Sequence, residues 1–147
     1  MGRVLIIDDE ESTREIISII LKKEGHEIST AVDGKQGLML AQNEKPDIIL
    51  LDIRMPVMDG IEVLKALKGS DATSPIPVVM ITALPQERER AIENGCDEFL
   101  TKPIDRLELI ARVRSLTRLS KLFRDLDLSI EYLLRLKKGV KNDTSFK

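Results

Sequence analysis

The sequence is poor in cysteine, histidine and aromatic residues: its 147 residues include one cysteine, one histidine and no tryptophan, and aromatic residues make up 3%. Cys96 alone cannot form an intrachain disulfide, and no group of cysteines and histidines has the spacing of a zinc site. The sequence therefore contains no sign of an oxidising compartment or a structural metal. His26 lies in a loop-like Gly-His-Glu context, and we interpret it as a surface residue rather than a ligand.

Long hydrophobic runs and a strong excess of one charge are also missing. The apolar run at residues 4–7 is too short for a signal peptide, and no run approaches the length of a membrane span. The 23 basic and 25 acidic residues leave a net charge of -2, which argues against a dedicated nucleic-acid or membrane-surface binder. We therefore expect a cytoplasmic protein that has neither nucleic acid nor membrane as a direct partner.

With 42% hydrophobic and 33% charged residues, the chain has the composition of one globular domain with a short appendage. Apolar runs of strand length lie near residues 4–7, 28–32, 48–51, 78–81 and 99–100, and segments with helical spacing separate them. Ser12 and Asp59 are the expected helix caps. Glycines mark the expected helix ends: Gly25, Gly34, Gly69 and Gly95. This alternation predicts an α/β fold, a doubly wound parallel sheet with helices on both faces.

Polar residues follow four of the predicted strands. Asp8 and Asp9 end the first strand, Asp52 the third, Thr82 the fourth, and Lys102 follows the fifth. The carboxyl ends of parallel strands share one edge of the sheet, and ligands bind at that edge. Each residue alone would be interpreted as a cap or a solvated side chain. Their convergence instead predicts a site with three carboxylates, a hydroxyl and an ammonium group.

Clustered carboxylates repel one another, and a divalent cation relieves that repulsion. An all-oxygen ligand set with few carboxylates suits Mg²⁺ better than Ca²⁺. Lys102 and Thr82 could then hold the oxygens of a phosphoryl group. Asp52 lies on the expected central strand, where its carboxylate could attack phosphorus to form an acyl phosphate.

Four motifs carry a family resemblance: VLIIDDE, ILLDIRMPVMDGIEVL, MITA and FLTKPI. Over residues 3 to about 117 the chain resembles the receiver domain of two-component response regulators. The resemblance implies a flavodoxin-like sheet of five parallel strands in the order 2-1-3-4-5. It also implies phosphorylation of Asp52 by a sensor histidine kinase or a phosphotransfer protein.

The resemblance assigns a role to each residue of the predicted site. Asp8, Asp9, Asp52 and the backbone carbonyl of Arg54 would arrange Mg²⁺. Lys102 would contact the phosphoryl group. Thr82 and Phe99 match the family's switch pair. Phe99 lacks the hydroxyl of tyrosine, so we expect its ring to favour the inward position even before phosphorylation.

The chain departs from the family pattern at two places. The helix between Thr82 and Gly95 is about two residues shorter than is common, which would reshape the surface that it helps to form. Arg54 and Leu84, two residues beyond Asp52 and Thr82, flank the path by which water attacks the acyl phosphate. We expect this bulky pair to slow hydrolysis.

Residues 105–138 contain neither glycine nor proline, and residues 105–147 hold 11 basic and 6 acidic residues. We divide the chain into a receiver domain, 1–118, and a helical extension, 119–147, with a frayed polar end. Apolar residues in the extension have the 3,4 spacing of a coiled coil: Leu116, Leu119, Phe123, Leu126, Ile130 and Leu133. The helix is expected to join two copies as a homodimer; alternatively it folds back, or breaks near residues 125–127. The chain is either a fragment of a longer regulator or a stand-alone receiver.

These observations favour a phosphorylation-driven signalling switch whose only chemistry is its own phosphorylation and dephosphorylation, rather than an enzyme with turnover. One alternative is a receiver-like interaction module that binds partners without phosphorylation. Another is a metal-dependent phosphatase, which would need a second acid near Asp52; Asp52-Ile53-Arg54 lacks one.

Overall fold

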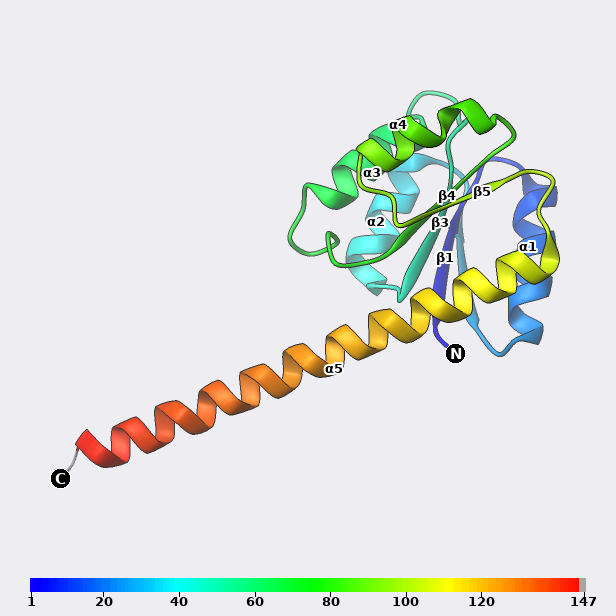
Figure 1. The fold of residues 1–147 in the computed structure, drawn as a ribbon. Helices are drawn as coiled ribbons and strands as arrows, with labels where there is room; N and C mark the ends of the chain where they lie inside the picture. Colours follow the sequence, from blue (N-terminus) through cyan, green and yellow to red (C-terminus); the bar gives the residue numbers. More distant parts are fainter. Residues whose placement is uncertain (146–147) are drawn as a thin grey trace.

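The computed structural model describes residues 1–145, with side chains described up to residue 138. Its core is one parallel sheet of five strands in the order β2-β1-β3-β4-β5 (Figure 1). The strands are β1 (Arg3–Ile7), β2 (Glu27–Ala31), β3 (Ile48–Asp52), β4 (Val78–Thr82) and β5 (Glu98–Thr101). This confirms the fold class and the strand order implied by the resemblance.

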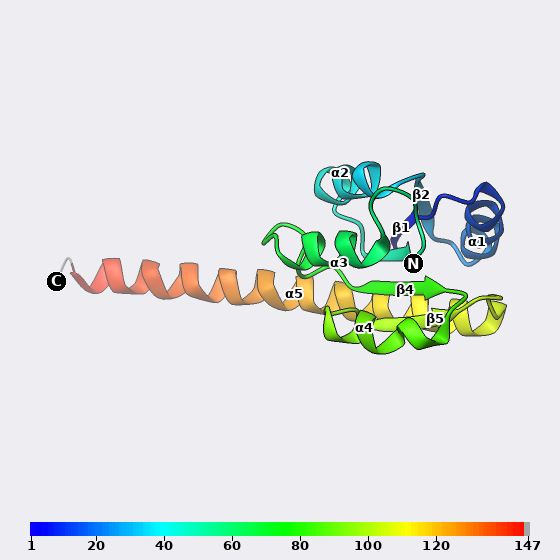
Figure 2. The same ribbon diagram turned by 90° about the horizontal axis from the view of Figure 1, so that it is seen from above.

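Helices cover both faces of the sheet (Figures 1 and 2). One face carries α1 (Glu11–Lys23) and the first part of α5 (Arg106–Ser145). The other carries α2 (Gly34–Glu44), α3 (Gly60–Lys68) and α4 (Arg88–Glu93), which follows a 3-10 turn, η1 (Pro85–Glu87). The sheet is therefore doubly wound, as the alternation of apolar segments predicts.

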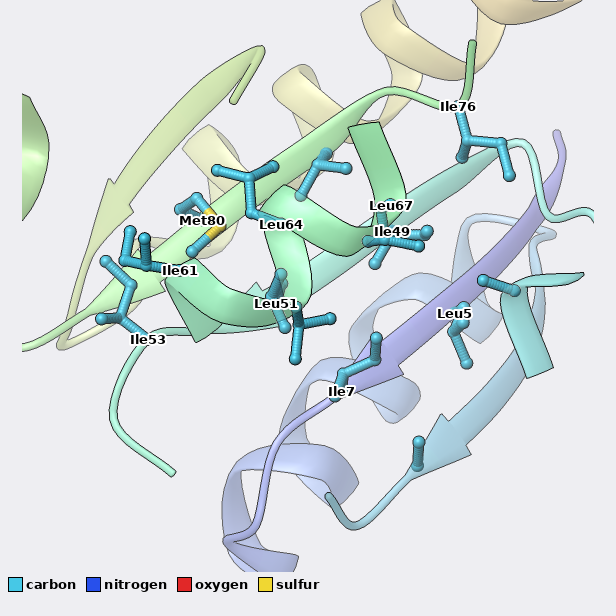
Figure 3. Packing of buried hydrophobic residues seen from close by; sticks show 14 of the residues in the cluster. Leu5, Ile7, Ile49, Leu51, Ile53, Ile61, Leu64, Leu67, Ile76 and Met80 are labelled. Atoms are coloured by element: carbon cyan, nitrogen blue, oxygen red, sulfur yellow. The ribbon is translucent and has the colours of Figure 1, made fainter. Parts of the chain in front are cut away.

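Each face of the sheet has its own apolar core, because successive side chains of a strand point to opposite faces. Leu5, Ile7, Ile49 and Leu51 belong to the core under α2, α3 and α4 (Figure 3). The intervening residues of the same strands contribute to the core under α1 and α5. Both sides of β1, β3 and β4 are covered, which is why these strands are continuous apolar runs.

One of the two predicted helix caps is confirmed. The Asp59 carboxylate accepts a hydrogen bond of 3.0 Å from the Glu62 N–H at the start of α3. The prediction for Ser12 was wrong, because the cap position is Glu10, two residues earlier, and α1 begins at Glu11. The Glu10 N–H donates to the Asp8 carboxylate at 2.9 Å, so the residue at the strand end contacts the backbone at the helix cap.

Three of the four predicted helix ends are confirmed, since Gly25, Gly69 and Gly95 follow α1, α3 and α4. Gly34 instead begins α2, after the cap residue Asp33. A Cβ atom on Gly34 would lie 2.7 Å from a methyl group of Val63, so glycine is needed there for close packing of α2 on α3. Glycine at this position does mark a helix boundary, but it is required for packing against a neighbouring helix and not for ending a helix.

The interpretation of His26 as a surface residue was also wrong. The side chain is buried, with 7% of its surface exposed, and its Nδ1 accepts a hydrogen bond of 3.0 Å from the Gly2 N–H. Burial lowers the pKa of the imidazole, and the nearby N-terminal amine adds to that effect. The loop context of His26 is correct, but the N-terminal segment covers it, and no local pattern records that contact.

Helix α5 is continuous and does not break at residues 125–127 (Figure 1). Its Leu116 packs against the core under α1, Arg124 forms an ion pair with the buried Asp47, and the Lys121 ammonium donates to the Met1 carbonyl. All side chains at residues 121–138 are exposed. Among the residues that the structure describes, no helix combines the length and apolar character of a membrane span.

Candidate functional site

The carboxyl ends of β1, β3 and β5 bring Asp8, Asp52 and Lys102 together. The Lys102 ammonium lies 3.4 Å from Asp8 Oδ2 and 3.5 Å from Asp52 Oδ1. Both carboxylates are nearly inaccessible, with 3% of each side chain exposed. By strand alternation these three residues continue the face that α1 and α5 cover, so their convergence follows from strand order and register.

Four acidic residues form the rim of this site: Asp8, Asp9, Glu10 and Asp52 each offer an oxygen, and these oxygens lie within 4.8 Å of one another. Asp8 and Asp52 are buried, whereas Asp9 and Glu10 are exposed. A set of carboxylate oxygens with open positions toward solvent fits Mg²⁺. Sequence reasoning missed Glu10, whose position directly after Asp8 and Asp9 was the available signal; its carboxylate also lies 3.7 Å from Lys102.

Burial and charge repulsion set the titration of the site. Burial raises the pKa of Asp52 to about 6, the Asp8 carboxylate adds to the rise, and Lys102 opposes it. Burial likewise raises the pKa of Asp8. For Lys102, burial acts to lower the pKa, but attraction by Asp52, Asp8 and Glu10 outweighs it and the net shift is upward. One ammonium therefore only partly compensates the carboxylates, and a cation is the natural further partner.

The segment after Asp52 turns tightly into α3. The Gly60 N–H donates to the Ile53 carbonyl at 2.8 Å, and a Cβ atom on Gly60 would lie 2.2 Å from the Asp52 carbonyl oxygen. Only glycine permits this approach. Val57 adopts a positive φ of 69° in the same segment, a conformation that is unusual for a β-branched residue. The role of the Arg54 carbonyl as a metal ligand stays a prediction.

Thr82 lies at the end of β4 on the opposite face of the sheet, and its side chain is completely buried. Its hydroxyl donates to Glu87 Oε1 at 3.1 Å and accepts from the Leu84 N–H at 3.3 Å. Glu87 also pairs with Arg54, whose Nε lies 3.1 Å from the same oxygen. Sequence reasoning missed Glu87, because nothing in the pattern of η1 indicates which strand end its carboxylate would reach.

Phe99 pairs with Met80 across β5 and β4, and it packs at the edge of the core under α3 and α4. The ring is half-buried, neither solvent-exposed nor fully enclosed. Its inward position and its coupling to Thr82 stay predictions. The segment between Thr82 and Gly95 holds the 3-10 turn and a six-residue α4. That this helix is shorter than is common in the family stays a prediction.

Comparisons with known proteins identify a family for this chain. The family described as the response regulator receiver domain matches residues 4–114. The chain is 49% identical over 119 residues to the response regulator PleD of Caulobacter vibrioides, covering 80% of this chain and 26% of PleD. It is 42% identical over 120 residues to the DNA-binding dual master transcriptional regulator RpaA of Synechocystis, covering 80% of this chain and 50% of RpaA.

Solved structures show the same fold. The chemotaxis response regulator CheY4 of Vibrio cholerae superposes with a TM-score of 0.74 at 32% identity, covering 79% of this chain and 98% of CheY4. NtrX from Brucella abortus has a TM-score of 0.76 at 31% identity, covering 86% of this chain and 29% of NtrX. The chain corresponds to only part of its curated relatives, 26% of the length of PleD and 50% of the length of RpaA.

Proposed function

Because the chain belongs to the response regulator receiver domain family, we propose that it is a phosphorylation-activated switch in which Asp52 accepts a phosphoryl group from a sensor histidine kinase or a phosphotransfer protein. The observation that carries this proposal is the position of Lys102, whose ammonium lies within 3.5 Å of carboxylate oxygens of both Asp52 and Asp8. A lysine so placed can stabilise the charge of a phosphoryl group on Asp52. Such partners act in the cytoplasm, and we propose that location for this chain.

The proposed reaction is a transfer between two side chains. An oxygen of the Asp52 carboxylate attacks phosphorus, the bond between phosphorus and the donor histidine nitrogen breaks, and a mixed anhydride forms on Asp52. Lys102 then moves its contact from the carboxylate toward the new phosphoryl oxygens. The chain catalyses only this step and the later hydrolysis of its own acyl phosphate, and it turns over no other substrate.

Receiver domains bind Mg²⁺ at an acidic pocket, and the acidic rim described above matches that chemistry. Asp8, Asp9, Asp52 and the backbone carbonyl of Arg54 would hold the ion. When bound, it would supply positive charge between the carboxylates and the phosphoryl oxygens. The buried Asp8 and Asp52 gain most from this charge, since burial and then repulsion by Asp8 raise the pKa of Asp52.

We further propose that α5 joins two copies of the chain. Leu116 of the predicted seam is committed to the domain's own core, but the five later members are all exposed, each by 45–61%: Leu119, Phe123, Leu126, Ile130 and Leu133. A continuous helix with such a seam is typical of a two-stranded coiled coil. Phosphorylation would then act by changing how two receiver domains pack beside the paired helices.

Phosphorylation with acetyl phosphate and Mg²⁺, followed by intact-mass measurement, tests the central proposal. We expect the mass of one phosphoryl group on the wild-type chain and none on Asp52→Asn. Asp71→Asn is the matched control, because Asp71 is an exposed acid outside the site and its loss should leave phosphorylation unchanged. Equal phosphorylation of Asp52→Asn and wild type would overturn the assignment. If neither acetyl phosphate nor a histidine kinase phosphorylates the wild-type chain, the result would favour an interaction module that works without phosphorylation.

A further inference from the structure

The single donor proton of the Thr82 hydroxyl already has an acceptor in this structure. It accepts a hydrogen bond of 3.3 Å from the Leu84 N–H and donates its proton to Glu87 Oε1 at 3.1 Å. A hydroxyl has a single proton to donate. While Glu87 accepts that proton, Thr82 cannot donate it to a phosphoryl oxygen on Asp52.

Glu87 is itself held in place. The Arg54 Nε lies 3.1 Å from the same carboxylate oxygen that accepts the Thr82 hydroxyl. The Glu87 side chain is 11% exposed, whereas that of Arg54 is 67% exposed, so the pair encloses the acid and leaves the guanidinium at the surface. Arg54 lies two residues beyond Asp52, and the contact therefore joins the segment after β3 to the start of α4.

The surroundings of this pair are open and polar. A hollow of about 440 Å³ lies between the segment after β3 and the start of α4, lined by both side chains of the pair and by Met55, Asp59 and Arg90. Arg90 lies 3.9 Å from Asp59 across it, a second ion pair between α4 and the start of α3. Two ion pairs across this hollow therefore connect the start of α4 to the segment after β3 and to the start of α3.

We propose that Glu87 is a positioning residue that competes with the phosphoryl group for the Thr82 hydroxyl and so holds the unphosphorylated switch in its resting arrangement. The inference rests on the proposed phosphorylation of Asp52. On phosphorylation, the Thr82 hydroxyl donates its hydrogen bond to a phosphoryl oxygen instead of to Glu87 Oε1, and Glu87 stays paired with Arg54. The exchange frees the start of α4 from the end of β4, which transmits the signal to the surface of α4.

Beryllofluoride with Mg²⁺, a phosphoryl mimic, measures this competition directly by calorimetric titration. We expect Glu87→Ala to bind beryllofluoride about tenfold more tightly than wild type, because a hydrogen bond between a hydroxyl and a charged acceptor no longer has to be broken. Glu87→Gln retains an acceptor but loses the charge, and its affinity should lie between the two. Glu89→Ala, which removes an exposed acid from the first turn of α4, is the matched control and should bind like wild type.

A double variant separates this role from a merely structural one. In Thr82→Val the hydroxyl is absent, so adding Glu87→Ala should change the beryllofluoride affinity by less than twofold. Thermal unfolding of each variant checks that it is folded. Wild-type affinity in a folded Glu87→Ala, or an equal gain in the Thr82→Val background, would overturn the inference while leaving the proposed function standing. Failure of the wild type to bind beryllofluoride and to accept a phosphoryl group would contradict the proposed function, and the inference with it.

Discussion

The Asp52 carboxyl is buried beside another carboxylate, and its pKa is raised to about 6 from an ordinary value of 3.8. The folded state therefore binds this proton more tightly than the unfolded chain does. Between about pH 4 and pH 6 the folded state holds more protons, so the contribution of Asp52 to the free energy of unfolding falls as pH rises. At neutral pH and without Mg²⁺, the ionised Asp52 destabilises the fold that positions it.

We expect Asp52→Asn to raise the free energy of unfolding at pH 7 by about 1 to 3 kcal/mol, and by much less at pH 4. Urea unfolding followed by circular dichroism at both values, without Mg²⁺, measures this. The lowered pKa of His26 adds a pH dependence of opposite sign, so the comparison is between variant and wild type at each pH. Asp71→Asn is again the control. A difference in the free energy of unfolding between Asp52→Asn and wild type that is the same at pH 7 and pH 4 would contradict the raised pKa.

At the scale of elements, the junction of β3 and α3 positions Asp52. Gly60→Ala would place a Cβ atom 2.2 Å from the Asp52 carbonyl oxygen, and backbone atoms cannot move aside as a flexible side chain can. We expect a loss of about 2 to 3 kcal/mol in the free energy of unfolding and slower phosphorylation by acetyl phosphate. Gly69→Ala, at the end of the same helix with a φ of -84°, is the control and should change stability much less. Equal losses in the free energy of unfolding for Gly60→Ala and Gly69→Ala would contradict a specific requirement for glycine at the β3–α3 junction.

The exposed apolar seam of α5 is the proposed dimer interface, which substitutions can test. We expect the wild-type chain to sediment as a dimer. Replacing Leu126 and Ile130 by lysine places charge on the proposed interface and should give a monomer in sedimentation velocity. Leu128→Lys, which changes another exposed leucine that lies off the seam, should leave the dimer in place. Sedimentation is measured with and without beryllofluoride and Mg²⁺. A wild-type chain that stays monomeric in both states at high concentration would remove α5 as the dimer contact.

At the scale of the whole molecule, α5 and the sheet are joined beyond the predicted domain boundary at residue 118. The buried Asp47 accepts from the Arg3 N–H at 2.7 Å and pairs with Arg124, and Lys121 donates to the Met1 carbonyl. These contacts attach the α5 segment that follows the domain to the edge of the sheet remote from Asp52. They set the direction in which the exposed part of α5 leaves the domain (Figure 2).

A chain ending after residue 118 leaves Asp47 buried without the guanidinium, whereas one ending after residue 124 keeps it. We expect the free energy of unfolding of the shorter chain to be lower by about 1 to 3 kcal/mol. This loss is smaller than that for a fully buried ion pair, because the Arg124 side chain is 57% exposed. Urea unfolding at low protein concentration measures this without a contribution from assembly. Arg124→Ala in the full chain should reproduce much of the loss, and Arg118→Ala, an exposed arginine on the same helix, should not. Equal stability of the two shortened chains would show that the contacts contribute nothing.

The strands, the layers and the main strand-end residues of the site follow from patterns in the amino-acid sequence. Continuous apolar runs that alternate with helical segments are typical of central strands of a parallel sheet, and the residues that follow such strands meet at its edge. Asp8, Asp52 and Lys102 could be placed together for that reason, without knowledge of any particular contact. The cap at Asp59 was equally accessible, since it depends on a few neighbouring residues.

The partners of several polar side chains depend instead on how the whole chain packs. Glu87 reaches Thr82 and Arg54, and the N-terminal segment buries His26, through contacts between parts of the chain that no local pattern connects. Gly34 begins a helix because of a neighbour on α3, not because of its own turn. Local periodicity encodes which face of an element is buried, whereas the distances between particular side chains depend on how all the elements pack together.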